Sequence, residues 1–169
     1  MKVALIEKEN NGLTQTITSF FKFRKDIIIT NHTNTTVNLY KENDFIIFLN
    51  CKETLPEESN AKIIQTHASL LPAFNTETPI KDAFLAGVKV SGITVSYADE
   101  KIIAQFPVLI DYNTDFEDFE ANIRKTEKML YPIVLKSVFD NKPFSFSDIM
   151  GNSQHEGCSG NCGSCSDCH

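Results

Sequence analysis

The sequence predicts an α/β domain of three layers, in which a mostly parallel sheet carries an antiparallel hairpin at one edge. Two β-branched runs, at 2–7 and 26–30, flank a helical pattern, which indicates a strand-helix-strand unit. Residues 44–49 form a continuous apolar run, typical of a parallel strand that is buried on both faces. Residues 88–97 and 102–110 alternate between apolar and polar positions on either side of a short turn, which indicates a hairpin.

The remaining elements follow from local signals along the chain. The first helix places Ile17, Phe20 and Phe21 on one face. A polar helix is predicted over 33–42, and another strand over 61–66.

Two helices carry their own start and stop signals. A short helix is predicted between Thr78, as its cap, and Gly87, just past its end, with proline at the first helical position. Thr114 and Glu117 form a capping box that opens a long amphipathic helix, which Pro132 should kink. Its core-facing positions are Phe116, Phe119, Ile123, Leu130, Val134 and Val138.

Charge and hydropathy exclude several classes of partner. Twenty-two acidic residues against 16 basic ones give a net charge of −6, and the basic residues are scattered, so we expect no nucleic-acid partner. No apolar run approaches about 18 residues, so we expect no membrane span. Glu7 interrupts the amino terminus before a signal-peptide core develops, so we expect a cytoplasmic location with a reducing environment.

The apolar periodicity stops at Ser147, so we predict a folded domain over 1–146 and a flexible, cysteine-rich tail over 147–169. Three, two and two residues separate the four tail cysteines, with Gly and Ser between them. Four thiolates at this spacing predict a zinc site or an iron–sulfur cluster, with His155 or His169 as substitute ligands. The alternative is a flexible tail with passive thiols. Cys51 is interpreted as a core residue. The predicted metal ligands are Cys158, Cys162, Cys165 and Cys168.

The most informative segment, 65–74, is an apolar strand that breaks at His67 and then enters a turn at Leu70-Leu71-Pro72. The carboxyl end of a strand is where open α/β sheets place their chemistry. Together with 86–95 and 102–105, this segment resembles the formyltransferase family, most closely its phosphoribosylglycinamide formyltransferase branch.

The resemblance runs from about residue 44 to residue 139 and implies a Rossmann-like fold that binds a formylated tetrahydrofolate, in a family of one-carbon and purine-biosynthesis enzymes. It also implies that His67 is catalytic, with Gln65 in place of the family's asparagine. The family's loop carrying an aspartate is shortened here to a tight turn, where Asp99 is the candidate substitute. Leu70, Leu71 and Tyr97 are the residues that would contact the folate.

These departures lead to the functional prediction. Gln65 displaces its amide by ~1.5 Å relative to an asparagine, and a misplacement of about 1 Å can cost ~100-fold in rate. The segment 7–12, where the resemblance implies a phosphate-binding loop, carries Glu7 and Glu9. We therefore predict a diverged protein that is impaired in formyl transfer from 10-formyltetrahydrofolate to glycinamide ribonucleotide. It would act as a binding or regulatory protein, with a small-molecule ligand and a metal- or redox-responsive tail.

Two alternatives remain open at this stage. The first is an active one-carbon transferase or hydrolase that uses His67 and Gln65 on a different, non-phosphorylated amine, or with water as the acceptor. The second is a domain that only anchors a metal-handling or thiol-exchanging tail.

Overall fold

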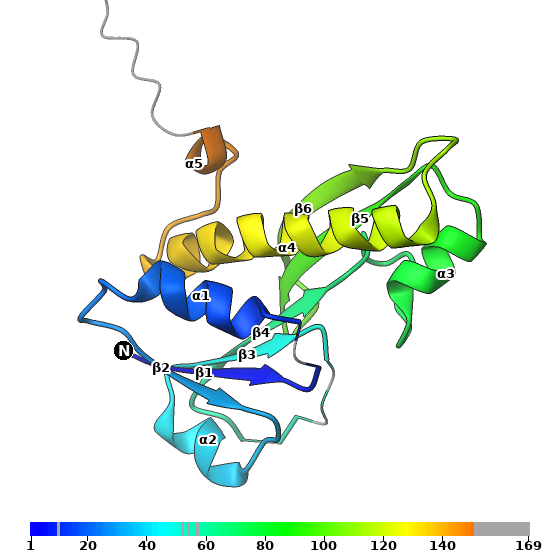
Figure 1. Ribbon diagram of the computed structural model, residues 1–169. Helices are drawn as coiled ribbons and strands as arrows, with labels where there is room; N and C mark the ends of the chain where they lie inside the picture. Colours follow the sequence, from blue (N-terminus) through cyan, green and yellow to red (C-terminus); the bar gives the residue numbers. More distant parts are fainter. Residues whose placement is uncertain (10, 52, 54, 57, 151–169) are drawn as a thin grey trace, which may run out of the picture.

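The computed structural model describes residues 1–150 except positions 10, 52, 54 and 57, and it has a six-stranded sheet between layers of helices (Figure 1). The strand order is β2-β1-β3-β4-β5-β6. The first four strands are parallel to one another, and β5 and β6 run antiparallel at one edge, which confirms the predicted fold class. The strands are β1 (Lys2–Glu7), β2 (Ile28–His32), β3 (Phe45–Leu49), β4 (Lys62–His67), β5 (Val90–Tyr97) and β6 (Ile102–Leu109).

The central strand β3 is buried along its whole length, as its continuous apolar run predicts. Successive side chains of a strand point to opposite faces. Phe45, Ile47 and Leu49 therefore join the core under the long helix, while Ile46 and Phe48 join a smaller core on the other face.

Helices cover both faces of the sheet (Figure 1). On one face α1 (Leu13–Phe21) lies beside α4 (Phe116–Phe139), and α3 (Pro79–Leu85) packs against the amino-terminal part of α4. On the opposite face lies α2 (Val37–Glu42), which begins later than the predicted helix over 33–42.

The caps of the helices differ from the sequence expectation. Helix α4 is capped by Asp115, whose side chain accepts a hydrogen bond from the backbone N–H of Asp118, and not by Thr114. Asp115 is the better cap because its carboxylate both accepts this bond and interacts favourably with the helix dipole. Thr78 precedes α3, but its hydroxyl donates to the Asp82 carboxylate instead of capping the backbone. Helix α4 continues through Pro132.

The hairpin of β5 and β6 requires a glycine at one position. A Cβ atom on Gly92 would lie 2.0 Å from the backbone oxygen of Phe106 and 2.8 Å from a methyl carbon of Leu70. Only glycine lets two strands and a loop approach so closely. Leu70 is thereby seated on the face of the hairpin opposite α4.

The last described residues form a helical turn, α5 (Ser147–Met150). Its Ile149 packs against the main core, and the Asp148 carboxylate accepts hydrogen bonds from Ser137 and from the backbone of Ser145. These four residues belong to the predicted tail, and the rest of that tail, with its four cysteines, lies outside the described residues. None of the helices described over residues 1–150 is long and apolar enough to span a membrane.

Candidate active site

The candidate cleft, which His67 lines, lies at the carboxyl ends of β3 and β4 and has a volume of about 590 Å³. The ends of parallel strands meet there, and α3 and the first half of α4 complete the walls. Among the lining residues are His67, Asn50, Asn75, Glu120 and Arg124. The lining combines apolar side chains, such as Ile80 and Phe116, with charged groups of both signs, so the cleft suits a ligand that has both apolar and polar parts.

His67 is the last residue of β4 and is only 8 % exposed. Its Nε2 lies 3.1 Å from the backbone oxygen of Phe74. A carbonyl oxygen can only accept a hydrogen bond, so Nε2 must carry the proton of this contact. The imidazole is thus anchored to the loop that follows its own strand.

That loop is fixed by a polar network on the hairpin. The Thr94 hydroxyl donates to the backbone oxygen of Ser69 at 2.7 Å and accepts from the backbone N–H of Leu71 at 3.1 Å. The Gln105 amide donates to the backbone oxygen of Leu71 at 2.8 Å. Leu70 and Leu71 are consequently held against β5 and β6, and neither is among the described residues that line the cleft.

The structure places the other predicted site residues along β4 and β5. Gln65 precedes His67 by two positions on β4, so the two side chains share a face of the strand. Gln65 lies opposite Ser96 on β5, is half-buried, and is not among the described cleft-lining residues.

Tyr97 and Asp99 lie farther from His67. Tyr97 pairs with Ile64 across the sheet, and Asp99 shares a shallow pocket with Lys62 at the opposite end of β4. Lys62 and His67 are five residues apart, or about 16 Å along the strand at about 3.3 Å per residue. The structure therefore separates Asp99 from the imidazole.

A buried polar network lies beneath the cleft. Glu127 on α4 is 0 % exposed, and its carboxylate accepts a hydrogen bond from the side-chain amide of Asn50 at 2.7 Å. Arg124 donates to the same carboxylate at 3.2 Å, and the Tyr131 hydroxyl at 3.4 Å. Burial raises the pKa of the Glu127 carboxyl. Glu127 therefore holds Asn50 and Arg124, two cleft residues, in place.

Sequence reasoning missed Glu127, although a signal was present. The predicted core stripe of α4 includes Ile123 and Leu130, and position 127 lies four residues after the first and three before the second. These spacings put Glu127 on the same face of the helix. A lone glutamate in an apolar stripe indicates a buried carboxylate with partners of its own.

Cys51 also lines the cleft and is half-buried. Its thiol lies 3.5 Å from the backbone oxygen of Ile6, and burial raises the pKa of the thiol. A raised pKa disfavours the thiolate, which is the form in which a cysteine acts as a nucleophile. Within residues 1–150, apart from the four undescribed positions, no group of three or more His, Cys, Asp or Glu residues is placed to hold a metal ion.

Comparisons with known proteins agree on one family. Residues 7–135 match the family model described as formyl transferase. A phosphoribosylglycinamide formyltransferase of Bacillus subtilis is 45 % identical over 91 residues, which are 51 % of this chain and 47 % of that protein. A formyltetrahydrofolate deformylase of Escherichia coli is 31 % identical over 110 residues, which are 57 % of this chain and 39 % of that protein. The matched segments thus span less than half the length of these two relatives.

Solved structures share the fold. The phosphoribosylglycinamide formyltransferase of Bacillus halodurans superimposes with a TM-score of 0.69 at 23 % identity, over 86 % of this chain and 100 % of that one.

Proposed function

This chain belongs to the formyl transferase family, and from that premise we propose that its His67 cleft binds a formylated folate without efficient transfer of the formyl group to glycinamide ribonucleotide. The protein would then act in binding or regulation and not as an efficient formyltransferase. The observation that carries the proposal is the hydrogen bond from His67 Nε2 to the backbone oxygen of Phe74.

Formyl transfer needs a donor that stabilises the developing oxyanion and a group that takes the proton from the amine. The Nε2 proton of His67 is already donated to its own chain, and releasing it would cost about 0.5–1.5 kcal/mol. The nearest predicted substitute for a catalytic carboxylate, Asp99, lies at the far end of β4 beside Lys62. The engaged proton of His67 and the distance of Asp99 both favour a protein that binds its ligand over one that turns it over.

A second candidate is a hydrolase that uses water as the formyl acceptor, with His67 and Gln65 in the catalytic roles. The similarity to a formyltetrahydrofolate deformylase favours it. A hydrolase needs no ribonucleotide acceptor, so the two acidic residues in segment 7–12 would not hinder it. Release of formate from 10-formyltetrahydrofolate in the absence of any amine distinguishes this candidate from the first.

Titration with 5-formyltetrahydrofolate, followed by calorimetry, tests the binding role. We expect saturable binding at one site and at least tenfold weaker binding by His67→Ala, because the ring forms part of the cleft wall. His32→Ala is the matched control, since His32 lies in a different cavity, and it should bind like the wild-type protein. The absence of saturable binding to a folded wild-type protein would refute the proposal.

We further propose that the tail binds one zinc ion or iron–sulfur cluster through Cys158, Cys162, Cys165 and Cys168. Thiolate donors at short spacing support it, because they select zinc and iron–sulfur chemistry over magnesium or calcium. A cytoplasmic, reducing location, which we also propose, would keep these thiols available.

We predict about one metal site per chain after reconstitution under reducing conditions, measured by metal analysis. Changing Cys162 and Cys165 together to serine should eliminate the metal, since two of the four donors are lost. Cys51→Ser should retain it, because Cys51 lies in the folded domain. Equal metal content in the wild-type protein and the double variant would show that the tail thiols are passive.

A further inference from the structure

The loop that joins β4 to α3 forms one wall of the His67 cleft. Residues 75–78 of this loop all line the cleft, and they belong to no helix or strand. All four are exposed, so burial in the apolar core does not hold them in place. The shape of this wall therefore depends on the polar contacts at the two ends of the segment.

At one end the segment is tied to Asp82 on α3. The Asp82 carboxylate accepts a hydrogen bond from the Thr76 hydroxyl and another, at 3.2 Å, from the Thr78 hydroxyl. Helix α3 is a firm support for these bonds, because its Ile80 and Ala83 are buried in the main core. Asp82 itself is not among the described residues that line the cleft, so any effect of Asp82 on a ligand passes through the loop.

At the other end the segment follows Phe74, whose backbone oxygen accepts hydrogen bonds from two side chains. This oxygen lies 3.1 Å from Nε2 of His67 and 3.4 Å from the hydroxyl of Ser69. Phe74 has a φ of 51°, in the left-handed region that residues other than glycine rarely adopt. Such a conformation persists only where the surrounding contacts hold it. Thr76 follows Phe74 by two positions, so the bond from Thr76 to α3 is one of the contacts that hold this carbonyl.

We propose that Asp82 is a positioning residue for the His67 cleft. By holding Thr76, Asp82 keeps the Phe74 carbonyl in place, and that carbonyl accepts the Nε2 proton of the imidazole. The simpler alternative is that Asp82 only stabilises the first turn of α3, where a negative charge interacts favourably with the helix dipole. The alternative predicts no effect on the His67 ring, because a charge on the helix alone leaves the loop untouched.

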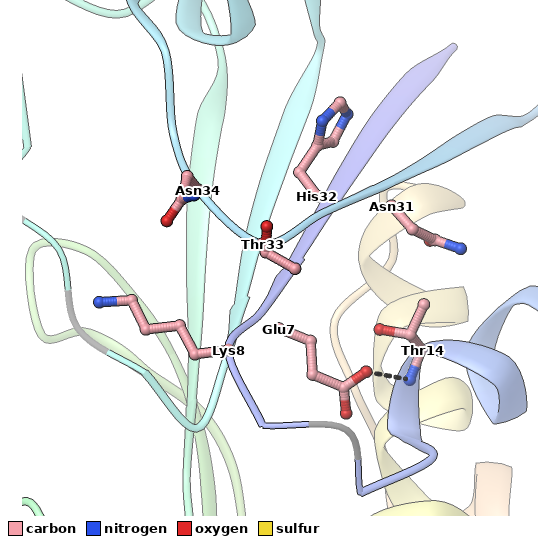
Figure 2. Close-up of a pocket in the computed structure, with 7 residues that line it drawn as sticks. All are labelled: Glu7, Lys8, Thr14, Asn31, His32, Thr33 and Asn34. Carbon is pink, nitrogen blue, oxygen red and sulfur yellow. Dashed lines mark hydrogen bonds between the residues drawn. The ribbon is translucent and has the colours of Figure 1, made fainter.

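The test is the exchange of the His67 ring proton with water, measured by NMR on the ¹⁵N-labelled full chain without ligand. His67 is only 8 % exposed and its Nε2–H is hydrogen-bonded, so we expect a separate, slowly exchanging signal, which His67→Ala assigns by its absence. His32 is the internal reference, because it lines a separate cavity at the carboxyl ends of β1 and β2 (Figure 2). The signals of the His32 ring should be the same in every variant.

We expect Thr76→Val and Asp82→Ala each to raise the exchange rate by about threefold or more, because each removes a hydrogen bond that holds the loop. The double variant should exchange like Asp82→Ala, since both changes break the same contact. Asp82→Asn should exchange at close to the wild-type rate, because its amide oxygen still accepts the bond from Thr76 although the charge is gone.

Asp148→Ala is the matched control. It also removes a carboxylate that accepts two hydrogen bonds, from Ser137 and from the backbone of Ser145, but this carboxylate lies on α5. The exchange rate of the His67 ring proton should therefore stay at the wild-type value.

The consequence for ligand binding rests on the proposed function. Asp82→Ala should bind 5-formyltetrahydrofolate about threefold or more weakly than Asp148→Ala does, because the wall of the cleft is no longer held. Equal binding by these two variants would contradict the link between Asp82 and the ligand. Because the exchange is measured without ligand, a wild-type protein that binds no folate would refute the proposed function alone and leave the positioning of the ring standing.

Three results would overturn the inference about the ring. The first is a His67 ring proton that exchanges too fast to be seen in the wild-type protein, because its hydrogen bond would then not hold. The second is a wild-type exchange rate in Thr76→Val or in Asp82→Ala. The third is an equal increase in Asp82→Asn and Asp82→Ala, because the charge on α3 would then be what matters. Thermal unfolding of each variant, measured in parallel, separates loss of the contact from loss of folding.

Discussion

Replacing Glu127 by alanine is expected to lower the free energy of unfolding by about 1–3 kcal/mol, because the groups that donate hydrogen bonds to its buried carboxyl group lose their acceptor. The alanine would strip partners from the Asn50 amide, the Arg124 guanidinium and the Tyr131 hydroxyl at once. It would also leave a cavity under the cleft. Chemical denaturation monitored by circular dichroism measures the loss.

Glu120→Ala is the matched control for this prediction. Glu120 lies on the same helix and pairs with the same Arg124, at 3.5 Å, but its side chain is 43 % exposed. Exposed pairs of this spacing contribute about 0.3–0.5 kcal/mol, so the two glutamates should differ severalfold. Equal losses for Glu120→Ala and Glu127→Ala would show that burial does not set the importance of Glu127.

Because the pKa of Glu127 is raised in the folded state, the stability of the protein should depend on pH. The folded state holds the proton to a higher pH than the unfolded state does, so this group favours folding when protonated. Its contribution to stability is therefore present below the unfolded pKa and is lost as pH rises towards the folded pKa. Glu127→Gln cannot titrate, so its stability should change less with pH in that window than the wild-type protein's does.

The sheet was predictable because its signals are local. Burial of β3 follows from a run of five apolar residues, and the edge hairpin follows from alternation around Asp99 and Glu100. The start of α4 was misassigned by one residue because Thr114 and Asp115 both carry good capping side chains, and only the backbone conformation selects between them.

The details of the candidate site were less predictable, for physical reasons. The hydrogen bond of His67 is made to a backbone oxygen, that of Phe74, and side-chain identity does not encode which carbonyl lies nearby. The placement of Asp99 depends on the register of β5 against β4, which a sequence pattern leaves open. Glu127 could have been found from its spacing, but its partner Asn50 comes from a distant strand end.

The most direct test of the central claim is the rate at which the purified protein formylates glycinamide ribonucleotide with 10-formyltetrahydrofolate, measured beside the Bacillus subtilis relative in one assay. We expect turnover more than tenfold below the relative's, because the extra methylene of Gln65 would displace its amide by about 1.5 Å, and a displacement of about 1 Å can cost about 100-fold. The hydrogen bond of His67 to the backbone of Phe74 and the carboxylate of Glu7 should lower the turnover further. Turnover within tenfold of the relative's, abolished by His67→Ala, would contradict the account and make the protein a working formyltransferase.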